Sequence, residues 1–180
     1  SFIPETKLIF VGKPSNEIKE TLNQLIEELK LRDKVFITGF VDEEKWKLYL
    51  ASADLVVQLR KNTRGEVSRA LLDALSFGKP VIVNTYGFIN ELPDNIVFKI
   101  KESFSIEELS TILEKLYENK DLREKIGKNA QKWVEENLNA ESIMELLGPF
   151  FVGFLKGALK NVPMSDLTRL GASVAQLPKL

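Results

Sequence analysis

The chain has 180 residues, of which 44% are hydrophobic and 28% are charged, an ordinary composition for a globular protein with one core. Its 25 basic and 26 acidic residues give a net charge of -1, and no basic block predicts binding to nucleic acid. Cysteine and histidine are absent, which excludes disulfides, thiolate metal ligands, a cysteine nucleophile, a histidine general base and most zinc sites.

In chain order, five apolar and β-branched segments predict strands, at residues 7–12, 35–40, 55–59, 80–84 and 96–100. Helical periodicity lies between them, with Ser15 and Asp42 as typical N-caps and a helix over about 67–77 that Gly78 closes. Strands that alternate with helices through short turns predict a parallel sheet, and their continuous apolar runs predict that both faces are covered. The fold class is therefore α/β, a Rossmann-like doubly wound parallel sheet of about five strands.

The pattern becomes helical after residue 101. Ser105 and Glu108 predict a capping box, a second helix begins near Asp121, and a third covers residues 138–160, followed by a tail or linker at 161–180. The apolar run at 146–159 is too short to span a bilayer. It predicts a contact with another domain, a homodimer contact or a contact with a membrane surface, although its weak basic content argues against the membrane.

The beginning of the chain has no signal-peptide pattern in residues 1–6. The absence of cysteine also fits a reducing compartment. We therefore expect a cytoplasmic location, with a membrane-peripheral one as the alternative.

A more specific pattern covers residues 65–91, where an acidic loop precedes a helix with a second acid, followed by Gly-Lys-Pro-Val and then Gly-Phe-Ile-Asn-Glu. Residues 34–57 add a block of the form V-x-F-x-G, then Y, then A-D-x-x-V, and residues 8–12 read Leu-Ile-Phe-Val-Gly. The order and spacing of these blocks resemble family 4 glycosyltransferases over about residues 7–137. The resemblance implies the C-terminal sugar-nucleotide-binding domain of the GT-B fold, which residues 1–137 would form in part.

The resemblance also implies parts that do not match any residues of this chain. In the family, a strand and a Gly-Arg…Lys loop that grips the donor diphosphate come before the strand at 7–12, and an acceptor-binding domain comes before both. The family's strand order would make that first strand the central one. We therefore expect a partial domain whose sheet lacks its middle.

The loop at residues 60–66 and the start of the next helix are the predicted diphosphate site. In open α/β sheets, ligands bind beyond the carboxyl ends of the strands, where this loop lies. Gly65 allows close backbone approach, and the free amides of Val67, Ser68 and Arg69 with the helix dipole suit a phosphate. Basic side chains that would screen its charge are Arg60, Lys61 and Arg64. The alternative is an ordinary polar loop before a helix.

The resemblance implies roles for three acids. Asp73 matches the second acid of the family, normally Glu, which accepts hydrogen bonds from the ribose hydroxyls; a pair with Arg69 is the alternative or additional role. Glu66 is the candidate for the first, catalytic acid, although the family's spacing falls on Gly65. Glu91 matches the acid of Gly-x-x-x-Glu, with a turn residue as the alternative.

Two glycines complete the predicted donor site. Gly87 opens the Gly-x-x-x-Glu motif, and Gly39 would let the base stack close to the backbone, unless it only ends a strand.

The resemblance implies that the intact protein transfers a sugar from a nucleotide sugar to a glycan or lipid acceptor, with retention of configuration and without a metal or other cofactor. We expect the chain alone to be inactive. Two alternatives stay open: a sugar-nucleotide 2-epimerase of the GT-B fold, and a non-catalytic interaction module that kept the fold.

Overall fold

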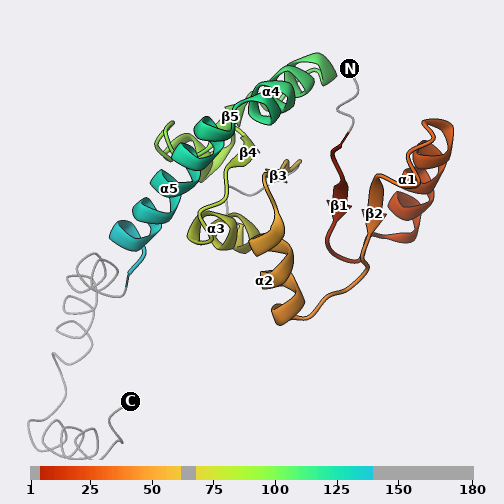
Figure 1. The fold of residues 1–180 in the computed structure, drawn as a ribbon, viewed down its shortest axis with the longest axis horizontal. Helices are drawn as coiled ribbons and strands as arrows, with labels where there is room; N and C mark the ends of the chain where they lie inside the picture. The colour runs from red at the N-terminus through yellow and green to blue at the C-terminus, as the bar shows by residue number, and fades with distance from the viewer. Residues whose placement is uncertain (1–4, 62–67, 140–180) are drawn as a thin grey trace, which may run out of the picture. The chain divides into compact units, whose positions relative to one another are not determined.

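The structure is a computed structural model that describes residues 5–61 and 68–139. The chain divides into two units, Ser1–Glu135 and Glu136–Leu180, and the elements below lie in the first, apart from the last two residues of α5. Figure 1 shows them in chain order. The strands are β1 (Leu8–Phe10), β2 (Val35–Ile37), β3 (Val56–Gln58), β4 (Val81–Asn84) and β5 (Phe98–Ile100). The helices are α1 (Asn16–Glu28), α2 (Glu43–Ser52), α3 (Arg69–Ser76), the 3-10 turn η1 (Gly87–Asn90), α4 (Ile106–Glu118) and α5 (Lys120–Asn137).

The helix ends follow the local chemistry of the sequence. Ser15 Oγ accepts from the Ile18 amide at 3.3 Å, and Asp42 Oδ1 accepts from the Lys45 amide at 2.8 Å, as side chains at N-caps do. Ser105 and Glu108 make both bonds of the predicted capping box, at 2.8 and 3.2 Å. Gly78 follows α3 with a φ of +64°, which confirms the predicted helix end.

The start of α3 differs from the prediction, because the helix begins at Arg69 and not near residue 67. Ser68 has an extended backbone, with φ -80° and ψ 124°, and its carbonyl accepts the first helical bonds from Leu71 and Leu72. Ser68 is therefore the N-cap of the helix and lies outside its first turn.

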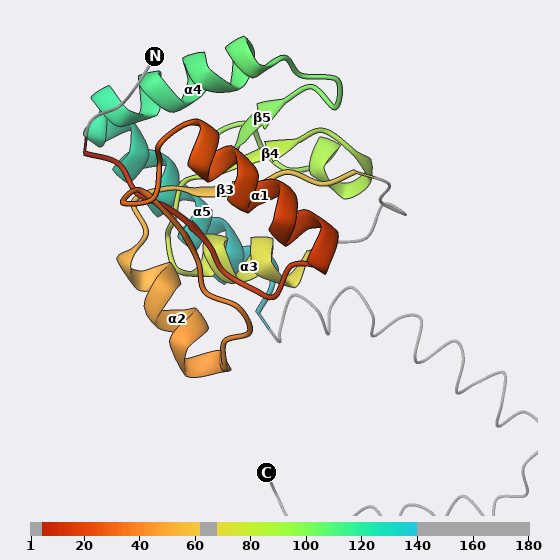
Figure 2. The same ribbon diagram turned by 90° about the vertical axis from the view of Figure 1, so that its right-hand side faces the viewer.

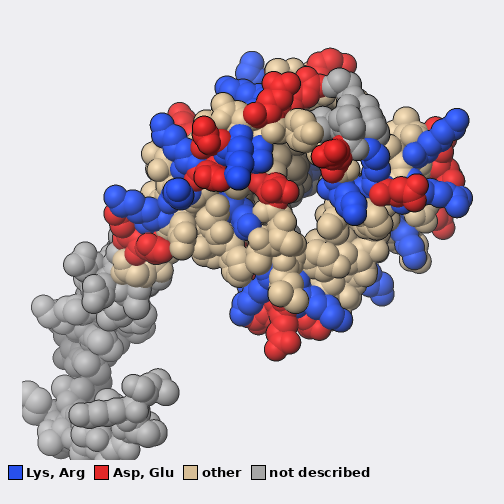
Figure 3. All heavy atoms as spheres, in the orientation of Figure 1, with Lys and Arg blue, Asp and Glu red and all other residues tan. Residues whose placement is uncertain are grey.

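The five strands form two separate parallel sheets. β1 pairs with β2, with Ile9 opposite Phe36, and the other sheet has the order β3-β4-β5, with β4 between its neighbours. No backbone pairing joins the two sheets within residues 5–61 and 68–139. In the space-filling view, an opening separates the region of β1 from that of β3 and α2 (Figure 3).

The core surrounds β4, and each of its four residues is buried. Val81 and Val83 point to a cluster that includes Leu71 and Leu75 of α3 and Ala130 of α5. Ile82 points to the opposite face, where it packs in a cluster with residues of β5 and α4. Both faces of this sheet are therefore covered, as the continuous apolar strand predicted, with α4 on the side away from α3 (Figures 1 and 2).

The β1–α1–β2 part does not have this double cover, so here the prediction was wrong. All three residues of β1 are exposed, from 38% to 47%, and α1 has no buried residue. Apolar side chains of α1 and of its C-cap stay exposed, with Ile18 exposed by 54% and Leu29 by 62%. The physical reason is that β1 has β2 as its one paired neighbour in the described structure, so no continuous sheet supports packing here.

Several predicted features lie outside the described residues: the helix at 138–160 beyond residue 139, its apolar run at 146–159 and the tail at 161–180. Within the described part, none of the helices combines the length and hydropathy that a membrane crossing requires.

Candidate functional site

Polar side chains gather where β3 and β4 end, at the carboxyl edge of their sheet. Asn84, the last residue of β4, is 2% exposed. Its Oδ1 accepts from the Arg60 amide and its Nδ2 donates to the Arg60 carbonyl, both at 2.8 Å. The amide group of Asn84 thus pairs with the segment after β3 as a neighbouring strand would. This holds residue 60 beside the end of β4, where ligands of open α/β sheets bind.

A second polar contact fixes the start of α3. Gln58, the last residue of β3, donates from Nε2 to Ser68 Oγ at 3.2 Å, and Ser68 is 7% exposed. The hydroxyl of Ser68 makes no capping bond to α3. The amino end of α3 therefore lies at the carboxyl edge of β3, and the side chain of its N-cap does not cap the helix. The backbone amides of an uncapped helix start are suited to bind an anion.

Asp73 lies in the middle of α3 and faces α2. Its Oδ2 accepts from Trp46 Nε1 at 3.0 Å, and Arg69 Nε lies 3.7 Å from the same oxygen. The Asp73 side chain is 30% exposed, whereas that of Arg69 is 78% exposed. The pair with Arg69 that the sequence offered as an alternative role therefore forms, but the shorter contact joins Asp73 to α2.

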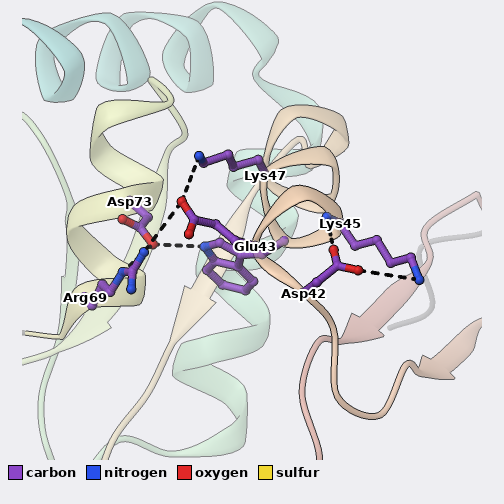
Figure 4. A network of polar contacts seen from close by, with 7 residues as sticks. Asp42, Glu43, Lys45, Lys47, Arg69 and Asp73 are labelled. Atoms are coloured by element: carbon purple, nitrogen blue, oxygen red, sulfur yellow. Dashed lines mark hydrogen bonds and ion pairs between the residues drawn. The ribbon is translucent and has the colours of Figure 1, made fainter.

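The network continues onto the first turn of α2, as Figure 4 shows. Glu43 Oε1 accepts from Lys47 Nζ at 2.8 Å and lies 4.0 Å from Arg69 Nη2. The hydrogen bond from Lys47, and then the charges of Lys47 and Arg69, lower the pKa of Glu43 below its ordinary value. Two carboxylates and two cations thus join the amino half of α2 to α3.

The segment after β4 holds Gly87 and Glu91. Gly87 begins η1 with a φ of +38°, and the exposed Glu91 is its C-cap. Lys99 of β5 holds the end of this segment, because Nζ donates to the Leu92 carbonyl at 2.6 Å and lies 2.7 Å from Asp94 Oδ1. Within the described residues, nothing pairs with the Glu91 carboxylate, which stays open to solvent.

Gly39 lies on the other sheet, just after β2. It has a φ of +71° and forms an isolated bridge with Gly12, whose amide donates to Thr38 Oγ1 at 3.2 Å. An open groove of about 730 Å³ at Gly39 is lined by residues of α1 and β2, such as Asn16 and Ile37, and by Lys13 from the loop before α1. None of the residues at the β3–β4 edge lines this groove.

The structure thus brings together some of the predicted site residues. Arg69 and Asp73 lie on α3 and Ser68 is its N-cap, and Gly87 and Glu91 follow the neighbouring strand β4. Gly39 follows β2 of the separate β1–β2 sheet. The other predicted residues, Arg64, Gly65, Glu66 and Val67, lie outside the described residues.

In the described part of the chain, charges of both signs are mixed and acidic side chains do not gather into a metal site. Lys and Arg alternate with Asp and Glu over the face in Figure 3, so neither sign dominates it. Within residues 5–61 and 68–139 there is no cluster of three or more acidic side chains suited to a metal ion.

Sequence reasoning missed Trp46, Gln58 and Asn84 as polar contacts of this edge. Trp46 lies in a stretch whose periodicity predicts only a helix, and its indole ring packs against the core while its N–H donates to Asp73. Gln58 and Asn84 were read only as parts of strands. The available signal is an amide side chain at or next to the end of each of two predicted strands, since an amide that becomes buried requires hydrogen-bond partners.

Parallel strands with a polar carboxyl edge, followed by the two helices α4 and α5, define the class of fold, that of GT-B C-terminal domains. The C-terminal domain of a group 1 glycosyl transferase from Francisella tularensis superimposes with a TM-score of 0.66 at 21% identity, covering 76% of this chain and 72% of that one. The chain belongs to the family of glycosyl transferases group 1, whose model matches residues 2–133.

Relatives agree with this assignment. The chain is 29% identical over 134 residues to an uncharacterized glycosyltransferase of Methanocaldococcus jannaschii, a match that covers 74% of this chain and 34% of that protein. It is 26% identical over 122 residues to the alpha-D-kanosaminyltransferase of Streptomyces kanamyceticus, with 67% of this chain and 31% of that enzyme covered. The chain thus spans about a third of the length of the curated relatives it matches.

Among solved structures, Anabaena HepE in complex with UDP-glucose superimposes with a TM-score of 0.73 at 22% identity, covering 84% of this chain and 42% of that one. At this identity, the likeness identifies the fold.

Proposed function

We propose that this domain binds the nucleotide-sugar donor of a retaining glycosyltransferase at the carboxyl edge of β3 and β4. The observation that carries the proposal is the position of Asp73, a partly exposed carboxylate on the helix that begins at this edge. Family membership supports the same reading. The acceptor, a glycan or a lipid, would be bound by another part of the intact enzyme.

In this proposal each part of the donor meets a group suited to it. The backbone amides at the amino end of α3 and the hydroxyl of Ser68 donate hydrogen bonds to the diphosphate, and Arg69 screens its charge. Asp73 accepts hydrogen bonds from the ribose diol, for which a carboxylate offers two acceptor oxygens. Gly39 and Gly87 permit close approach of the base and the sugar, and Glu91 faces the donor from the segment after β4.

Catalysis would depend on positioning and electrostatics, with no metal. Glu66 is the proposed catalytic acid, and Arg64, Gly65 and Val67 complete the proposed diphosphate loop. Residues 1–137 would form the donor domain, followed by a C-terminal helix at 138–160 and a tail at 161–180. The isolated chain is expected to bind donor without transferring sugar, and sugar transfer by this chain alone would contradict that expectation.

The first experiment is a calorimetric titration of the chain with UDP, GDP and ADP, each with and without its sugar. We expect saturable binding of one base. Asp73→Ala removes hydrogen bonds to a charged acceptor, so its affinity for that nucleotide should fall about ten- to hundredfold.

Glu118→Ala is the matched control, because it removes an exposed carboxylate from the end of α4, away from the proposed site. Its affinity should equal that of the wild type. Unchanged binding by a folded Asp73→Ala variant would overturn the ribose contact, and failure of the folded wild type to bind any of the nucleotides would overturn the donor site as a whole.

A further inference from the structure

We infer that Trp46 is a positioning residue, which orients the Asp73 carboxylate so that the other oxygen of this group faces the ribose hydroxyls of the donor. The inference rests on the proposed function. It adds a residue on a different helix, which acts through Asp73 and does not itself contact the nucleotide.

The first step concerns how the oxygens of Asp73 are used. Trp46 Nε1 donates to Oδ2 at 3.0 Å, and Arg69 Nε approaches the same Oδ2 at 3.7 Å. In the part of the chain that the structure describes, Oδ1 takes part in no hydrogen bond or ion pair. A carboxylate has about four lone-pair sites, so these two contacts leave Oδ1 and part of Oδ2 for hydroxyl donors.

The second step concerns the exposure of the carboxylate. The Asp73 side chain is 30% exposed, so it is anchored on one side and open on the other. A fully buried ion pair would not offer an acceptor to a ligand, and a fully exposed carboxylate would rotate freely. A carboxylate that is held at one oxygen and open at the other is already oriented when a diol approaches it.

The third step explains why Trp46 and not Arg69 sets the orientation. The indole ring of Trp46 packs against the hydrophobic core, and its N–H is a donor with no acceptor capacity. Packing therefore fixes both the ring and the direction of the bond. The guanidinium of Arg69 is 78% exposed, lies farther from Oδ2, and is shared with Glu43 at 4.0 Å. Such a solvated pair holds a side chain weakly.

The hydrogen bond from Trp46 to Asp73 also joins α2 to α3, so loss of the bond could act on the fold or on the orientation of the Asp73 carboxylate. A structural role affects the whole site and weakens every ligand alike. A positioning role weakens only the binding of ligands that have the ribose hydroxyls. The ligands that separate the two are UDP and 2′,3′-dideoxy-UDP, with the corresponding GDP and ADP pairs in parallel, because the dideoxy analogues keep base and diphosphate but lack the diol.

The test uses the full chain with Trp46→Phe, which keeps an aromatic ring and removes the N–H donor. We expect the affinity for the ribonucleotide to fall about two- to tenfold, the range of one hydrogen bond, while the affinity for the dideoxy analogue stays unchanged. Trp133→Phe makes the same change in α5, at the other of the two tryptophans, and should leave both affinities as in the wild type.

Equal weakening for both nucleotides, or no weakening for either, would overturn the inference. If Asp73→Ala lowers the preference for the ribonucleotide and Trp46→Phe does not, the proposed function stands and the inference fails. If the folded wild type binds none of these nucleotides, the proposed function fails and the inference fails with it.

A second measurement leaves Trp46 in place, in case Trp46→Phe folds poorly. The Trp46 indole N–H signal, assigned in an NMR spectrum by comparison with Trp133→Phe, reports the hydrogen bond to Asp73 directly. The signal should shift on addition of the ribonucleotide that binds and shift much less with its dideoxy analogue. Equal shifts with both would contradict the positioning role.

Discussion

At the scale of single residues, the α2–α3 contact shows how the value of a charge depends on its surroundings. Glu43 and Arg69 are exposed by 61% and 78% at the side chain, and their separation of 4.0 Å makes a weak, screened pair. The Asp73–Trp46 bond at 3.0 Å involves one charge and one neutral donor, and both partners are partly buried. The neutral donor therefore holds α2 to α3 more firmly than the nearest opposite charge.

Glu43 gives a prediction about proton binding. Its pKa should lie below that of a free glutamate, and Lys47→Ala should raise it more than Arg69→Ala does, because the Lys47 hydrogen bond is the larger cause. Since the folded pKa is the lower one, the stabilisation is complete above the unfolded pKa and is lost as the pH falls through the folded pKa. An NMR titration of the Glu43 carboxyl in the three proteins measures this. A larger rise with Arg69→Ala would contradict it.

At the scale of elements, the packing of α5 depends on Gly127. The helix approaches the turn after α3 so closely that a Cβ on Gly127 would lie 2.0 Å from the Gly78 carbonyl oxygen. Gly78 itself needs its φ of +64° to end α3. Two glycines that are 49 positions apart therefore allow α5 to contact the α3–β4 turn.

Gly127→Ala should consequently reverse the usual effect of this substitution. In an exposed helix interior, Gly→Ala stabilises by about 0.5–1 kcal/mol. Here we expect a loss of about 1–3 kcal/mol in the free energy of unfolding, because backbone must move to relieve the clash. Urea denaturation measures the change. Lys128→Ala, at the exposed neighbouring position, is the control and should stay within about 0.5 kcal/mol of wild type; a stabilised Gly127→Ala variant would contradict the close packing.

At the scale of the described domain, the two sheets differ in burial. All residues of β4 are buried between two hydrophobic clusters, whereas all residues of β1 are exposed. The hydrogen bonds of the exposed β1–β2 sheet open at a low free-energy cost, because few apolar contacts are lost when they break. The β1–α1–β2 part should therefore be the less stable region.

Amide hydrogen exchange tests this difference. The amides of β4 should exchange slower than those of β2 by on the order of a hundredfold or more, since local opening energies range from near zero up to the global stability. The strands β2 and β5 are matched in length, and β5 should be the better protected of the two. Equal protection of both sheets would mean that they unfold as one cooperative unit.

Much of the fold was predictable because its signals are local. The caps at Ser15, Asp42 and Ser105 and the helix end at Gly78 depend on residues within a few positions of one another. The same holds for the five strands, whose apolar runs identify them without knowledge of their neighbours. For the candidate site, the sequence singled out Ser68, Arg69 and Asp73, and the structure places Arg69 and Asp73 on α3 with Ser68 as the N-cap of that helix.

The sequence by itself determined the elements, their order and the family. The tertiary structure alone decided which strands pair, and it split them into two sheets with an exposed β1. It also decided the contacts that shape the site, Trp46 with Asp73 and Asn84 with Arg60, which join residues 27 and 24 positions apart. The physical reason is that periodicity and capping depend on neighbours along the chain, whereas pairing, burial and long-range hydrogen bonds depend on which distant segments the fold brings together.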